Sequence, residues 1–329
     1  VKAADTAAVL TQLLADKTAG RTKDGRTDLI WINGENFVAA RNSGLLYGPF
    51  AQMLPNWPLV DTIGKPSTVI DFTVPTDGYE SPWGLSQITF FHDAVRLASP
   101  PRTLPALLDW ARTRPGRFTY PAPPDFIGVT FLKQALHDLM VNPALLTRAA
   151  VDADFEGVTA PLWGWLNTLH PLLWRRGQAF PPDYPSMSRL FEDQETDLAF
   201  AFNPAEASTA VAAGRLPATT RAYVLDGGTI QNSHFVAIPF NASAKAGALV
   251  AADFILSPEA QARKADPTLW GDPTVLALDR LEPGDRARFD SIPQGSALPP
   301  PGDLDRNIPE PHGSWHLALE TAWRRRYAR

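Results

Sequence analysis

The sequence predicts an α/β protein with two lobes. Short apolar runs, typical of buried strands, alternate with segments whose apolar residues recur at helical spacing. Several runs end in a polar turn that contains Gly or Pro and leads into a helix, which is typical of parallel sheets. With 329 residues, 44% of them hydrophobic, the chain is long enough for two domains with self-sufficient cores.

The first third of the chain begins with a helix over residues 5–19, followed by a polar turn. The apolar run Asp28–Ile32 predicts a buried strand, which stops at a polar turn before a helix starts at Phe37. The predicted strands of this part are residues 28–32, 69–74 and 87–92. Residues 80–84 are expected to form a turn before the third of them.

Helix starts are clearest in the rest of the chain. Thr103 is a good N-cap with Pro105 in the first turn, and Ser257 precedes Pro258 in the same way. Pro171 interrupts a helical pattern over residues 162–174. Further helices are expected from Phe131 through Leu139, over 244–256 and over 314–327, and strands over 117–120, 198–202 and 235–239.

Composition excludes several classes of protein. The net charge of −5 leaves no basic face for nucleic acid, and no apolar run approaches the ~20 residues that span a bilayer. The absence of cysteine removes disulfides, thiolate nucleophiles and cysteine metal sites. His312 and His316 are four residues apart but lack a third ligand nearby, so no metal site is predicted.

Catalytic and cofactor motifs are also missing. The chain has no phosphate-binding or dinucleotide-binding glycine motif, and Gly84–Ile88 lacks the last glycine of a nucleophile elbow. We therefore predict no catalytic residue and no cofactor.

Four segments share the form of a strand, a polar turn and a helix, and ligands of α/β proteins bind where strands end. They are residues 33–36, 80–84, 121–128 and 203–206. We expect them to converge on one ligand-binding cleft. The alternative is that these segments are only turns and helix caps. Asp125 would then be a helix N-cap, Glu35 would interact with the dipole of its own helix, and Trp83 would pack at the hinge between the lobes.

Several longer motifs resemble those of the YnjB-type substrate-binding proteins of ABC transporters. The match extends from about residue 5 to the C-terminus, and Phe254–Gln261 is similar to a helix–cap–helix element of extracellular solute-binding proteins. The motifs are Asp28–Phe37, Glu80–Gly84, Tyr120–Gly128, Phe202–Ala205 and Ala265–Pro273.

The resemblance implies a type II periplasmic binding protein, with residues 1–90 plus 240–329 in lobe one and 91–239 in lobe two. Crossing strands near 86–96 and 229–239 would join the lobes. Such a protein, a monomer in the periplasm, closes on a small solute and delivers it to an ABC permease in the inner membrane. The family pattern also has a signal peptide, a first strand and a Trp-Gly-Gly loop, which we expect in a missing N-terminal segment.

The solute is expected to be an organic cation or a zwitterion, such as a thiamine-like molecule or a polyamine. Carboxylates beside an aromatic face suit a cation, whereas helix N-termini favour an anion, so a zwitterion or a phosphorylated cation satisfies both. The ferric-binding members of this broad fold typically use a pair of adjacent tyrosines. This chain has no such pair, so ferric iron is disfavoured as the solute. The expected ligand-binding residues are Asn33, Gly34, Glu35, Glu80, Ser81, Trp83, Asp125, Phe126, Gly128, Asn203, Trp270 and Asp272.

Two other functions stay open. An enzyme on the same fold would need a general base with a partner, which Glu35, Glu80, Asp125 or His234 could provide. A ligand sensor that keeps the fold without transport is the second alternative.

Overall fold

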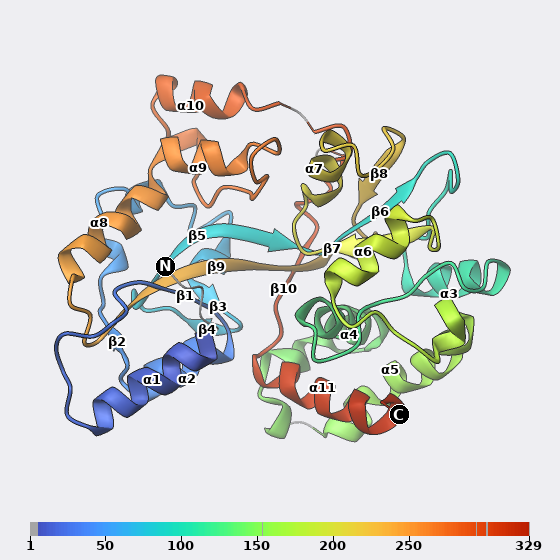
Figure 1. Ribbon diagram of the computed structural model, residues 1–329, viewed down its shortest axis with the longest axis horizontal. Helices are drawn as coiled ribbons and strands as arrows, with labels where there is room; N and C mark the ends of the chain where they lie inside the picture. The colour runs from blue at the N-terminus through green and yellow to red at the C-terminus, as the bar shows by residue number, and fades with distance from the viewer. Residues whose placement is uncertain (1–5, 153, 294, 301, 329) are drawn as a thin grey trace. The chain divides into compact units, whose positions relative to one another are not determined.

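The chain divides into two compact units (Figure 1). The computed structural model describes residues 6–152, 154–293, 295–300 and 302–328. Unit 1 comprises Val1–Ser86 and Asn232–Pro293, and unit 2 comprises Gln87–Gln231 and Gln294–Arg329. The chain therefore passes between the units after Ser86, after Gln231 and after Pro293.

The strands of unit 1 gather around β9 (Thr229–Pro239), whose first residues belong to unit 2. β1 (Ile30–Ile32) and β2 (Leu46–Tyr47) pair with β9 antiparallel, and β5 (Glu80–Gln87) also pairs with it. β3 (Ile70–Asp71) and β4 (Val74–Pro75) form a separate short hairpin. Ile32 lies opposite Phe235, and both are buried in the core.

Helices enclose this core of unit 1. They are α1 (Thr6–Thr18), α2 (Glu35–Asn42), α8 (Lys245–Leu256), α9 (Pro258–Ala265) and α10 (Pro283–Asp290). The hydroxyl of Ser257 accepts a hydrogen bond from the backbone N–H of Ala260, which caps α9 as the sequence predicts.

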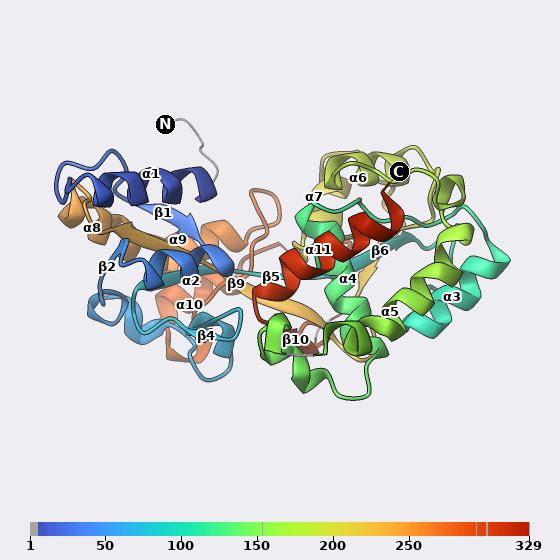
Figure 2. The same cartoon turned by 90° about the horizontal axis from the view of Figure 1, so that it is seen from below.

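In unit 2, β6 (Thr89–Asp93) lies between β7 (Leu198–Ala201) and β8 (Thr220–Tyr223) and is antiparallel to both. β10 (Asn307–Pro309) runs parallel to the first residues of β9. The helices are α3 (Leu104–Thr113), α4 (Phe126–Leu139), α5 (Phe155–Leu169), α6 (Tyr184–Glu192), α7 (Glu206–Ala212) and α11 (Ser314–Tyr327). α11 packs along α4 (Figure 2), and its Trp315 and Trp323 lie in the core with Phe131 and Leu132 of α4.

This packing gives a different division from the expected one. The expectation assigned residues 240–329 to lobe one, whereas residues 294–329 group with unit 2. The reason is the apolar side of α11, whose tryptophans are buried against α4 and α5.

The expectation of parallel sheets is wrong for most of the described strand pairs, although β10 runs parallel to β9. β1, β2, β7 and β8 all pair antiparallel, because each lies beside a strand that is distant in the sequence and runs the opposite way. The pattern of strand, turn and helix along the sequence does not show which distant strand each strand pairs with.

Three elements differ from their prediction. Residues 80–84 are part of the fully buried strand β5 and not a turn. Residues 69–74 contain two strands, because Phe72 and Thr73 have positive φ values of 44° and 75° and turn the chain. Residues 117–120 are not a strand, since the carbonyls of Arg117 and Phe118 accept hydrogen bonds from the N–H groups of Asp197, in a loop, and Trp174, at the start of a short 3-10 helix.

Candidate functional site

Three tryptophans and a histidine pack together in unit 1, and we call them the tryptophan group: Trp31, Trp83, Trp270 and His234. The Trp83 ring centroid lies 4.8 Å from that of Trp31, 5.1 Å from Trp270 and 5.7 Å from His234. Trp83 is buried, but Trp31 and Trp270 remain 44% and 45% exposed. Unit 1 therefore has two half-exposed indole rings, those of Trp31 and Trp270, that pack against the buried indole of Trp83.

Each ring is positioned by its element. Trp31 is the exposed central residue of β1, between the buried Ile30 and Ile32. Trp83 lies in β5, and its carbonyl accepts a hydrogen bond of 2.8 Å from the buried Gln261 amide. Trp270 follows α9 in a turn whose backbone N–H groups bond to the carbonyl of Asp266.

Asp272 lies beneath these rings. It accepts a hydrogen bond of 2.9 Å from the Lys264 ammonium and lies 3.3 Å from Nε2 of His234. Burial lowers the pKa of Lys264, and the Asp272 carboxylate opposes that shift. Gly84 is required here, because a Cβ atom would lie 2.2 Å from Oδ2 of Asp272.

Ser86, His234 and Asp272 do not form a proton relay. Ser86 Oγ lies 3.2 Å from His234 Nε2, and Asp272 contacts the same nitrogen. A relay needs one partner on each ring nitrogen. The three side chains therefore fix the imidazole beside the tryptophans.

Glu80 and Ser81, both predicted to bind the ligand, are completely buried in unit 1. Neither carboxylate oxygen of Glu80 has a hydrogen-bond partner within the described residues, and neither has the Ser81 hydroxyl. Burial raises the pKa of Glu80 well above its ordinary value, and the nearby Asp71 carboxylate adds to the rise while Arg41 opposes it. Burial thus favours the neutral form of the Glu80 carboxyl, which weakens the case for an ion pair between Glu80 and a cationic solute.

The predicted residues Asn33, Gly34 and Glu35 link β1 to α2. The N–H of Gly34 donates a hydrogen bond of 2.5 Å to Oδ2 of Asp71, and Gly34 has a φ of 59° that favours glycine. Glu35 is exposed in the first turn of α2, where its charge suits the helix dipole. Asn33 is half-buried.

In unit 2, three predicted residues have local structural roles. Asp125 caps α4 by accepting a hydrogen bond of 3.0 Å from the N–H of Gly128. Gly128 leaves no room for a Cβ, which would lie 2.1 Å from the Pro121 carbonyl oxygen. The amide oxygen of Asn203 accepts from the N–H of Ala205 before α7. These contacts match the turn-and-cap alternative.

Phe126 is the predicted unit 2 residue with an available ring. It is 37% exposed, stacks on His316 at 5.8 Å between centroids, and meets Phe202 at 5.5 Å. The Lys133 ammonium lies 5.3 Å from its centroid and is paired with Glu310. Burial, with Lys133 nearby, lowers the pKa of His316 to about 3, so its ring is neutral.

The structure thus brings Trp83, Trp270 and Asp272 together, and separately links Gly34 to the Asp71–Glu80 pair. The sequence did not lead us to expect Trp31 or His234 among the ligand-binding residues, and His234 was considered only as a general base. The alternation of Ile30, Trp31 and Ile32 was the available signal, because a tryptophan between two core positions faces away from the core.

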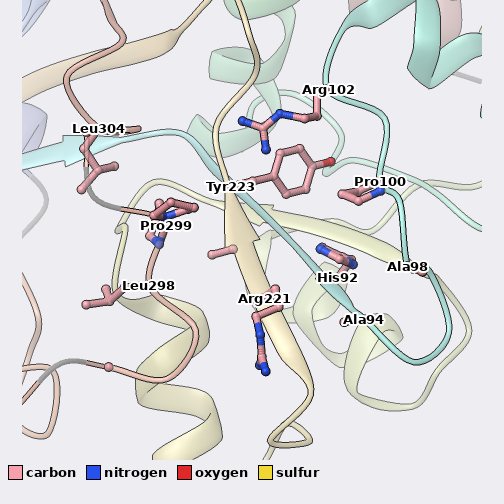
Figure 3. A pocket seen from close by; sticks show the side chains of 14 residues that line it. His92, Ala94, Ala98, Pro100, Arg102, Arg221, Tyr223, Leu298, Pro299 and Leu304 are labelled. Carbon is pink, nitrogen blue, oxygen red and sulfur yellow. The ribbon is translucent and has the colours of Figure 1, made fainter.

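A separate cavity of about 670 Å³ lies in unit 2 (Figure 3). His92, Arg102, Tyr223 and Pro299 are among its lining residues, and none of the predicted site residues is. The Arg102 guanidinium lies 5.4 Å from the Tyr223 ring centroid and is paired with Asp226 and Asp303.

The part of the chain that the structure describes holds neither a metal-binding cluster nor a membrane-spanning helix. No group of three or more His, Cys, Asp or Glu side chains there could hold a metal ion. None of the helices in the same residues has both the length and the apolar character needed to cross a bilayer.

Comparison with known proteins identifies the family. The family model of the bacterial extracellular solute-binding proteins matches residues 1–277. Protein YnjB of Escherichia coli (strain K12) is 45% identical over 328 residues, which cover 99% of this chain and 82% of that protein.

Solved structures share the fold at low sequence identity. An ABC transporter structure from Clostridium perfringens matches with a TM-score of 0.67 and 14% identity, over 99% of this chain and 88% of that chain. A periplasmic thiamin binding protein matches with a TM-score of 0.62 and 16% identity, over 100% and 86%. The fold is that of the type II periplasmic binding proteins. The chain therefore belongs to the bacterial extracellular solute-binding family and serves as the substrate-binding component of an ABC importer.

Proposed function

We propose that this importer component binds an organic cation or a zwitterion on the tryptophan group of unit 1. The observation that carries the proposal is the pair of half-exposed indoles, Trp31 and Trp270, that both pack on the buried Trp83. Indole faces attract cations and stack on flat rings, and each such contact contributes about 0.5–3 kcal/mol.

A carboxylate close to Trp31 in the sequence supports a cationic end on the solute. Glu35 is exposed, follows Trp31 by four residues, and has no ion-pair partner among the described residues. The Asp272 carboxylate is already neutralised by Lys264. Glu35 is therefore the carboxylate we assign to the solute in place of Glu80.

A periplasmic thiamin binding protein has the same fold, which supports a thiamine-like solute as one candidate. We also propose a periplasmic location and delivery of the solute to a permease in the inner membrane.

A thermal-shift screen tests the proposal. The parent chain is heated with thiamine, thiamine phosphates, putrescine, spermidine, neutral sugars and oxyanions. A ligand that binds the folded state stabilises it by RT ln(1 + [L]/Kd), so a cation or zwitterion should raise Tm by several degrees. A shift with sugars or oxyanions alone would contradict the proposed solute class.

Trp270→Ala locates the site. We expect it to weaken binding about 10- to 100-fold, as loss of a stacked ring does. The control is Leu269→Ala, which removes the adjacent apolar side chain, itself 58% exposed. Equal binding by the two variants would move the site away from the tryptophan group.

A further inference from the structure

Five arginines lie together in unit 2, outside the proposed solute contacts, and we call them the arginine face: Arg96, Arg114, Arg117, Arg175 and Arg176. The first three converge on the buried carboxylate of Asp197, with nitrogen–oxygen distances of 2.5 Å for Arg96, 3.6 Å for Arg114 and 2.7 Å for Arg117. One carboxylate thus holds three guanidinium groups.

Arg175 and Arg176 lie in the turn Trp174–Gly177, next to the Asp197 segment. The N–H of Trp174 bonds to the carbonyl of Phe118, and its indole N–H donates to Glu195 at 2.7 Å. Both arginines are exposed, and within the described residues neither has a carboxylate at ion-pair distance. Their φ values of 49° and 58° are uncommon for residues with side chains, and such strain concentrates at functional positions.

The face is positively charged in an acidic protein. Asp197 pairs with Arg96, Arg114 and Arg117, and Glu195 accepts a hydrogen bond from Trp174, so the arginines outnumber the carboxylates that contact this face. The whole chain carries −5. The excess is largest at Arg175 and Arg176, which have no carboxylate of their own.

An aromatic ring accompanies this charge. The Arg175 guanidinium lies 4.3 Å from the centroid of Trp174, which is half-buried. Tryptophan beside arginine is typical of protein segments at the membrane–water interface, where the ring sits among the headgroups and the cation meets phosphate.

We propose that the arginine face binds an anionic phospholipid surface and holds the protein at the membrane. A membrane fits better than an acidic protein partner because Trp174 adds an interfacial ring to the charge, and because a protein of this family hands its solute to a membrane transporter. The proposal is independent of which solute is bound.

Vesicle co-sedimentation of the full chain tests it, with equimolar phosphatidylcholine and phosphatidylglycerol compared with phosphatidylcholine alone. The parent should bind only the anionic vesicles, and less at high salt. The double variant Arg175→Gln/Arg176→Gln should lose about 25-fold in partitioning, because each arginine near an anionic surface contributes about fivefold. Arg175→Lys/Arg176→Lys should retain most of the binding.

The control is Arg286→Gln/Arg288→Gln on α10, which removes the same charge from residues paired with Asp290 and Asp285. It should bind like the parent. Equal losses in the two glutamine variants, or no binding by the parent, would overturn the proposal. Competition would also overturn the proposal. If free inorganic phosphate or an acidic peptide releases the protein from the anionic vesicles, the face is a phosphate site or a protein site instead.

Discussion

At the scale of single residues, two buried ionisable groups give the protein opposite responses to pH. Glu80 in unit 1 is completely buried without a hydrogen-bond partner in the described residues, and His170 in unit 2 is 7% exposed. Burial favours the neutral form of each, which raises the pKa of the acid and lowers that of the base.

Glu80 should make folding less favourable as pH rises. Its folded-state pKa lies above the ordinary value near 4.5, so between these two values the folded state binds more protons than the unfolded state. Stability is therefore lost as pH rises through that window. We expect Glu80→Gln to be more stable than the parent at pH 7 and to lose this dependence, in urea unfolding across pH. A less stable glutamine variant at pH 7 would show that the carboxylate is ionised and needed.

His170 should act in the other direction. Its Nε2 lies 2.7 Å from the hydroxyl of Tyr120, which accepts a hydrogen bond from the indole N–H of Trp323, so the hydroxyl donates to a neutral imidazole. Burial lowers its pKa from 6.5 to about 4. Stability should fall as pH drops from 6.5 to 4, by up to about 3 kcal/mol.

His170→Gln, which keeps an acceptor near Tyr120, should flatten that slope in the same unfolding series. An unchanged slope would assign the acid sensitivity to other groups.

Residue chemistry allowed part of the site to be predicted. Trp83 and Trp270 were selected as aromatic residues in polar segments, and they do pack together. Glu80 was misread because a carboxylate beside Ser-Pro is typical of a turn, whereas here it begins a buried strand. The burial of Glu80 depends on the pairing of β5 with the distant strand β9, which the local sequence does not show.

At the scale of elements, the starts of α3, α4 and α9 were predictable because capping signals are local, whereas the helix expected over residues 162–174 is α5 at Phe155–Leu169. Thr103, Asp125 and Ser257 each accept the expected capping hydrogen bond. Strand pairing was not predictable, because β9 and β6 take partners far along the chain.

Two helical glycines test the packing of elements. Gly128→Ala in α4 would place Cβ 2.1 Å from a backbone oxygen of Pro121, so we expect a loss of roughly 1–3 kcal/mol of unfolding free energy. Gly164→Ala in α5 meets no atom within 4 Å and should gain about 0.5–1 kcal/mol, because alanine has the higher helix propensity. Denaturant unfolding measures both; a neutral Gly128→Ala would mean that the loop before α4 yields easily.

At the scale of the whole molecule, sequence motifs predicted the family and the fold, and both are confirmed. The C-terminal helix was expected in lobe one but groups with unit 2. Its apolar residues predict that one side packs on a core, but they do not identify which core. Its tryptophans are buried in unit 2.

The central claim is that the tryptophan group of unit 1 binds the solute, and calorimetric titration tests it most directly. The solute found in the screen is titrated into the parent, Trp31→Ala, Trp270→Ala and the double variant. We expect each single variant to weaken binding by about 1–3 kcal/mol. The double variant should lose less than the sum, because both rings pack on Trp83 and removing one loosens the other. Parent-like affinity in both single variants would contradict the claim.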